Sequence, residues 1–203
     1  MKTLVKTINA YSFSELDVIA RETAKTAILE KERLPEYFSE DLTQALSANF
    51  GLDNLKTYYS LSYCQGDGLC LYGKITYDEL FNNGKFKNIA FKGIHYKQFN
   101  SLNSELLEID FVHKGRYHHA YSVCIESHEY APTDKQIEII EKVVSNVKSW
   151  YITFCRNWEN IGYKYFYDIS DEDMEFISNE YGYLFTDKGA LIDNDEYVEL
   201  KTV

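Results

Sequence analysis

Apolar and polar residues alternate in two neighbouring runs between residues 56 and 75. Strict alternation is typical of a strand with one buried face, and the Gln65-Gly66-Asp67-Gly68 segment between the runs is typical of a tight turn. We therefore predict a β-hairpin over residues 56–75. The same argument predicts a second hairpin from strands 106–113 and 117–127, which turns at Lys114-Gly115-Arg116.

Helical spacing replaces alternation in the longer segments. Apolar residues recur three and four positions apart over residues 14–31, 35–49 and 134–161, and such a stripe indicates an amphipathic helix. The last of these segments is the longest, and we place its Trp150 and Trp158 in the core.

Local signals mark where the helices begin. Ser14 and Asp17 resemble a capping box, Pro35 is suited to the first turn of a helix, and Ser170 is suited to cap a helix that ends at Tyr181. Three acidic residues follow Ser170, where the helix dipole favours negative charge.

Shorter elements fill the remaining segments. We predict a first strand over residues 2–9, a helical turn over 77–81, a strand over 89–94, and a small closing hairpin from 183–185 and 190–192. Helices bracket the strands without strict alternation, which predicts an α+β fold. We expect one domain, residues 1–203, in which an antiparallel sheet of two main hairpins packs on the long helix. A pair of N-terminal helices and a small acidic C-terminal helix-hairpin complete it.

Length and composition indicate which stabilising groups and which cellular compartment to expect. A chain of 203 residues can bury a core without disulfides or metal. Cysteines 64, 70, 124 and 155 lack metal-finger spacing, and the adjacent His118 and His119 would point to opposite faces of a strand. We expect no metal or cofactor. No apolar run approaches the length of a membrane helix, so we expect no membrane contact. We also expect the protein to be in a reducing cytoplasm, with its cysteines as free thiols.

Negative charge is concentrated at the C-terminal end. Residues 168–203 contain eleven Asp or Glu against two Lys or Arg, which gives this segment a net charge of −9. The net charge of the whole chain is −11, so most of it lies in this segment. This balance disfavours direct nucleic-acid binding by that end and favours a basic partner surface. Acidic ends that only solvate a protein are the alternative. The candidate partner-binding residues are Asp171, Asp173, Glu175 and Glu180.

Four segments resemble a family of small tailed-phage and prophage accessory proteins. They are Tyr11-Ser-Phe-Ser-Glu-Leu16, the hairpin Ser62-Tyr-Cys-Gln-Gly-Asp-Gly-Leu-Cys70, Gly115-Arg-Tyr-His-His119, and the tail Asn179-Glu-Tyr-Gly-Tyr-Leu-Phe-Thr-Asp-Lys-Gly189. Leu69 and Cys70 depart from the small and aromatic residues of the family's hairpin. The resemblance implies an accessory protein made in the cytoplasm of a bacterial host. It implies no particular activity.

One set of polar residues is a candidate ligand-binding site. If the two hairpins are neighbours in one sheet, Tyr63, Gln65 and Asp67 come near His113, Tyr117 and His119. Asp beside His is an acid–base couple, and Tyr with Gln suits recognition of a base or a ribose. Alternatively, Asp67 and its glycines only satisfy the tight turn, and the histidines are polar tips on a wet sheet face.

Two functions follow as hypotheses. The first is a phage anti-defence protein that inhibits a host nuclease or CRISPR-type complex through its acidic end. The second is a nucleotide-binding protein or small enzyme that sequesters or degrades a defence signal nucleotide through the Gln65/Asp67 hairpin. We favour the inhibitor and lean against an enzyme, because no catalytic set stands out. An exposed sheet edge would also allow the protein to form a homodimer.

Overall fold

The α+β architecture expected from the sequence is confirmed in the computed structural model, which describes residues 8–32, 35–81, 84–95, 98, 102, 107–128 and 132–192. These residues cluster into two compact units, Glu36–Tyr163 and a second unit formed by both chain ends. That residues 1–203 form one domain stays a prediction. Each unit is described by itself.

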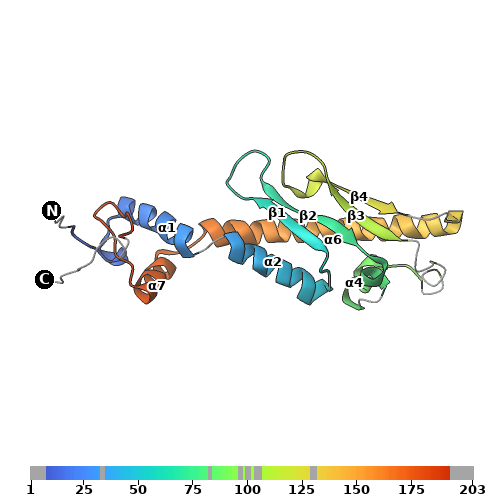
Figure 1. Cartoon of the computed structure of the whole chain (residues 1–203), viewed down its shortest axis with the longest axis horizontal. Coiled ribbons are helices and arrows are strands. Elements are labelled where there is room, and N and C mark those ends of the chain that lie inside the picture. Colours follow the sequence, from blue (N-terminus) through green and yellow to red (C-terminus); the bar gives the residue numbers. More distant parts are fainter. Residues whose placement is uncertain are drawn as a thin grey trace, which may run out of the picture. The chain divides into compact units, whose positions relative to one another are not determined.

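A four-stranded antiparallel sheet organises the Glu36–Tyr163 unit (Figure 1). Its order is β1 (Leu55–Ser60), β2 (Gly68–Ile75), β3 (Glu108–His113) and β4 (Val123–His128). The first predicted hairpin is confirmed, with Ser60 opposite Gly68 at its closed end. Because β2 and β3 are antiparallel, the β1–β2 and β3–β4 connections leave the same end of the sheet.

The second hairpin differs from the prediction in its connection. Strand β4 begins at Val123, and residues 120–122 form a 3-10 helix, η2 (Ala120–Ser122). The ring nitrogen of His119 accepts a hydrogen bond from the Tyr121 backbone N–H, which caps this helix and diverts the chain from the ladder. The predicted strand over 117–127 is therefore wrong for residues 117–122, which form a connection that includes η2.

Helix α6 (Asp134–Tyr167) supports the sheet, as the apolar spacing of residues 134–161 predicted. Its Tyr151 is buried and its ring lies 5.3 Å from that of Phe111 on β3. Trp150 and Trp158 pack against Phe50 and Phe38 respectively, but both tryptophans are only half-buried. The core beneath the sheet is thus centred on Tyr151 rather than on the tryptophans.

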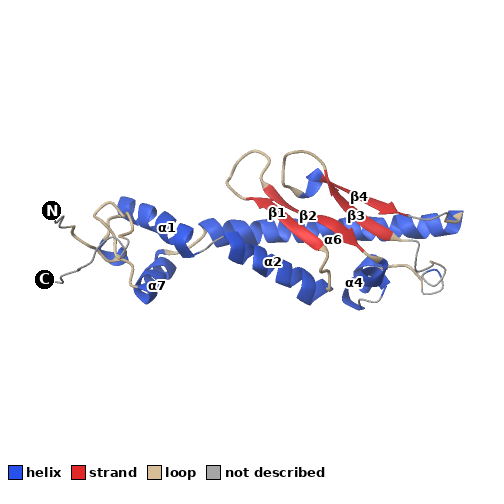
Figure 2. Cartoon of the chain, in the orientation of Figure 1, coloured by secondary structure: helices blue, strands red, loops and turns tan. Residues whose placement is uncertain are grey.

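Further helices among the described residues of this unit are α2 (Pro35–Phe50), α3 (Tyr77–Phe81) and α4 (Gly84–Ala90) (Figure 2). The first two were predicted. The predicted strand over 89–94 is wrong, because Phe86 and Ala90, four positions apart, are both buried on one face of α4. A short apolar run does not by itself distinguish a strand from a helix.

The unit formed by the chain ends is helical. It contains η1 (Phe13–Glu15), α1 (Val18–Glu32) and α7 (Asp171–Tyr181). Its core is a cluster of buried apolar side chains: Phe13, Leu16, Ala20, Ala24, Ile28, Met174 and Phe185. The closing hairpin is reduced to isolated bridges from Phe185 to Tyr11 and Leu191. The predicted first strand lies largely outside the described residues.

Caps fix the helix ends in this unit. Ser170 caps α7 as predicted. The predicted capping box at Ser14 is wrong, because the box is formed by Ser12 and Glu15 on η1. Asp17 instead accepts a hydrogen bond from the Ala20 N–H, at 2.8 Å, and so satisfies the first turn of α1. Among the residues that the structure describes, no helix combines the length and apolarity needed to cross a membrane.

Candidate functional site

The two glycines of the β1–β2 turn are in contact with the β3–β4 loop. A Cβ atom on Gly66 would lie 2.1 Å from Cδ1 of Tyr117, and one on Gly68 would lie 2.6 Å from Cβ of His119. Both glycines also have positive φ, +93° and +151°. A side chain at either position would therefore meet steric overlap as well as backbone strain. The sequence Gly-x-Gly lets the two loops lie directly on one another.

Asp67, between these glycines, is committed to its own turn. Its Oδ1 accepts from the Ser60 hydroxyl at 2.7 Å, and its Oδ2 accepts from the backbone N–H groups of Ser62, at 2.5 Å, and Cys64, at 2.7 Å. Burial acts to raise the pKa of this carboxyl, but hydrogen bonds from Cys64, Ser60, Ser62 and the Tyr163 hydroxyl outweigh it and hold the pKa below its usual value. Asp67 is thus an ionised structural group.

The six predicted ligand-binding residues are only partly brought together. Asp67 and His119 line one pocket. The backbone carbonyl of Tyr117 is 2.8 Å from Nε2 of His113, and the Tyr117 ring covers Gly66. Tyr63 instead stacks on Tyr163 with ring centroids 4.6 Å apart.

Gln65 and Tyr63 are both exposed near the tip of the turn. Neither contributes to the lining of the pocket. Tyr63 also has an unusual backbone for a residue other than glycine, with φ +56°. The predicted association of these two residues with the histidines is therefore not seen in the pocket.

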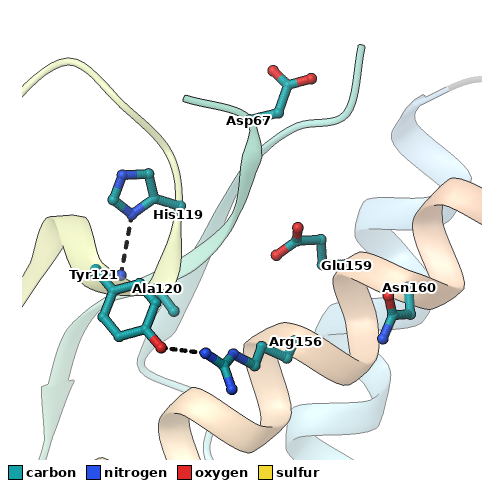
Figure 3. Close-up of a pocket in the computed structure, with 7 residues that line it drawn as sticks. All are labelled: Asp67, His119, Ala120, Tyr121, Arg156, Glu159 and Asn160. Carbon is teal, nitrogen blue, oxygen red and sulfur yellow. Dashed lines mark hydrogen bonds between the residues drawn. The ribbon is translucent and has the colours of Figure 1, made fainter. Parts of the chain in front are cut away.

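The pocket lies between the β3–β4 loop, the β1–β2 turn and helix α6, with a volume of about 400 Å³ (Figure 3). Its lining consists of Asp67, His119, Ala120, Tyr121, Arg156, Glu159 and Asn160. In Figure 3 the Glu159 carboxylate extends from the helix into the space, whereas the Asp67 carboxylate is turned away from the helix. The Arg156 guanidinium donates to the Tyr121 hydroxyl and lies 5.6 Å from the centre of the Tyr121 ring.

The protonation of His119 follows from its contacts. Nδ1 accepts from the Tyr121 backbone N–H at 3.2 Å, and a backbone N–H can only donate. Neutral His119 therefore carries its proton on Nε2. The pocket lining thus has hydrogen-bond donors on His119, Arg156 and Asn160. It has hydrogen-bond acceptors on Glu159 and on the amide oxygen of Asn160.

Sequence reasoning missed Tyr121, Arg156, Glu159 and Asn160. Tyr121 lies inside the predicted strand over 117–127, and the alternation of a strand gives it no particular role. The three α6 residues are polar positions at helical spacing, opposite the apolar stripe, and any amphipathic helix has such positions. The sequence therefore held no signal that separates them from ordinary surface residues.

A second cluster lies near the same loop. It consists of three side chains that could bind a metal ion: Cys70, His113 and His118. One ligand atom of each lies within 4.8 Å of those of the other two. Cys70 is fully buried, and burial raises the pKa of its thiol to about 11. The two imidazole rings are stacked, with centroids 5.2 Å apart. Cys64 lies outside this cluster, because it is exposed in the turn, whereas Cys70 lies opposite Tyr58 in the ladder.

The predicted acidic partner-binding residues have divided roles. Asp171 forms ion pairs with Lys25 at 2.5 Å and Arg21 at 3.3 Å, and the Lys25 hydrogen bond contributes most to holding its pKa below the usual value. Asp173 accepts from the Ser170 hydroxyl at 2.7 Å within the cap of α7. Glu180 is exposed and Glu175 half-buried. Asp171 and Asp173 therefore stabilise this unit itself.

We predict that Gly66→Ala destabilises the protein more than Gly115→Ala. Both positions have positive φ, near +93° and +103°, so both variants carry backbone strain, but only a Cβ at 66 meets the Tyr117 ring. The additional loss should be about 1–3 kcal/mol, the usual cost of overpacking. Urea unfolding of the two variants measures it. Equal losses would contradict the close contact between the loops.

Comparisons with known proteins place the chain in a family. Neither the curated proteins nor the solved structures gave a match. A family model described as a domain of unknown function, DUF8835, matches residues 36–175. The match covers more than half of the chain and includes the whole Glu36–Tyr163 unit, with both loops of the site. The chain therefore belongs to the DUF8835 family.

Proposed function

We propose that this protein binds a small polar ligand of nucleoside type in the pocket beside His119, Tyr121 and Arg156. The observation that carries the proposal is the packing of Tyr117 and His119 on Gly66 and Gly68. This packing fixes two loops against one another at the mouth of a pocket, and a pre-formed pocket binds without the cost of ordering its walls.

The chemistry of the lining supports a nucleoside. The Tyr121 ring, 65% exposed, offers an aromatic face on which a base can stack. Glu159 is placed to accept hydrogen bonds from an exocyclic amino group or ribose hydroxyls, and Arg156 is placed to donate to a carbonyl or phosphate oxygen. The volume of about 400 Å³ falls within the range of small-molecule sites.

The contacts of Asp67 favour binding over catalysis. A general acid or base must exchange a proton with its substrate, whereas both carboxylate oxygens of Asp67 accept hydrogen bonds within the turn. The Asp67–His119 couple is therefore a poor candidate for proton transfer. With the resemblance to phage accessory proteins, this supports sequestration of a signal nucleotide in the bacterial cytoplasm as the biological role.

The test is an NMR titration of the protein with AMP, GMP, CMP and UMP. We expect at least one to bind, with shifts confined to residues around the pocket. Arg156→Met should weaken that binding by about tenfold or more, because a charge-assisted hydrogen bond is lost. Arg116→Met is the matched control, since Arg116 also donates to a tyrosine hydroxyl, that of Tyr117 at 2.7 Å, but lies outside the lining.

Two results would contradict the proposal. The first is the absence of binding by all four nucleotides. The second is binding that Arg156→Met and Arg116→Met weaken equally, which would indicate general attraction of phosphate to positive charge.

A second candidate function is inhibition of a host nuclease or CRISPR-type complex through helix α7. Phe176 and Tyr181 are 69% and 60% exposed on this helix and follow Glu175 and Glu180 directly in the sequence. Exposed aromatic side chains with neighbouring charge are typical of a protein-binding surface. The observation supports a mixed aromatic and acidic contact more than mimicry of nucleic acid by charge alone.

This candidate predicts that Phe176→Ser and Tyr181→Ser together remove a stoichiometric partner that copurifies from a bacterial host. Val18→Ser with Ile19→Ser is the control, because those apolar side chains are even more exposed, at 77% and 81%, on α1. Native mass spectrometry identifies the bound protein. Retention of the partner by the α7 variant would exclude this surface.

A further inference from the structure

We propose that Cys70, His113 and His118 form a binding site for a transition-metal ion, with zinc(II) as the first candidate. One ligand atom from each side chain lies within 4.8 Å of the other two. A thiolate with two imidazoles is a ligand set that suits zinc and copper rather than magnesium or calcium.

Hydrogen bonding prepares His113 as a ligand. Its Nε2 is 2.8 Å from the backbone carbonyl oxygen of Tyr117. A carbonyl oxygen only accepts, so Nε2 carries the proton and Nδ1 of the neutral ring keeps a free electron pair. Metal-binding histidines usually donate their other N–H to such a carbonyl, which fixes the tautomer and the ring orientation.

The His118 ring supplies a second, independent observation. Its Nδ1 is buried and has no hydrogen-bond partner among the described residues. A buried polar atom without a partner costs free energy, and a bound cation would remove that cost.

Aromatic side chains lie beside the cluster. The Tyr58 ring, 44% exposed, lies 5.0 Å from the His118 ring and 4.5 Å from the Tyr72 ring, so aromatic side chains border the cluster on one side. On binding, Sγ of Cys70 would coordinate as the thiolate and release its proton to solvent.

Three protein ligands would leave a coordination position for water or another ligand. Catalytic zinc sites have this arrangement, whereas structural zinc sites have four protein ligands. The inference goes beyond the proposed nucleoside pocket, because none of the three ligands lines that pocket. It also departs from the expectation of no metal, which rested on the spacing of residues along the chain.

The experiment is metal binding to the full chain. Protein stripped with a chelator is titrated with zinc(II), and separately with cobalt(II) as a spectroscopic probe. We expect one equivalent to bind and cobalt to give a thiolate charge-transfer band. Cys70→Ser and His118→Gln should each weaken binding by about tenfold or more. Cys64→Ser and His128→Gln are controls, because both residues are exposed and lie outside the cluster.

Circular dichroism checks the fold of each variant. Because Cys70 is buried and its variant can lose stability, the half-buried His118 carries the test if Cys70→Ser does not fold. Absence of stoichiometric zinc or cobalt binding would overturn the proposal. Equal weakening by the control and cluster variants would do the same, since it would indicate adventitious binding to exposed groups.

Discussion

The contact of Tyr117 and His119 with the backbone of Gly66 and Gly68 is the interaction on which the site depends. The antiparallel order of the sheet brings both connections to one end, but topology alone would leave two separate loops. Close contact requires that both partners on the turn lack a Cβ, because a side chain at either position would overlap the opposing loop. The hydrogen bonds to Asp67 hold the turn in the conformation that presents these glycines.

Both proposed sites follow from this packing. His118 lies between Tyr117 and His119 in the chain, so the residues that anchor the loop also constrain the histidine between them. The hydrogen bond from His113 to the Tyr117 carbonyl ties the same loop to the end of strand β3. On the other side of the loop, His119 caps η2 and positions Tyr121 beside Arg156. The pocket beside His119 and the cluster of Cys70, His113 and His118 thus share one loop but no side chain.

The sequence predicted those features that periodicity or turn chemistry specifies. Helix α6 and the first hairpin were found because their apolar spacing is regular over many residues, and the Gly-Asp-Gly sequence correctly indicated the tight turn. The strand over 117–122 was wrong because the His119 side chain caps a 3-10 turn, a local hydrogen bond that alternation does not reveal. Arg156 and Glu159 carried no signal, and Cys70 and His118 are far apart in sequence, so only the folded chain brings them together.

The most direct test of the central contact is the NMR spectrum of Gly66. If the Tyr117 ring lies on this residue, ring currents should displace the Gly66 α-proton resonances strongly, and nuclear Overhauser effects should join them to the Tyr117 ring protons. Both signals should vanish in Tyr117→Ala, whereas Gly115, whose Cβ position is open, should show ordinary shifts throughout. Random-coil shifts for Gly66 without such effects would contradict the account.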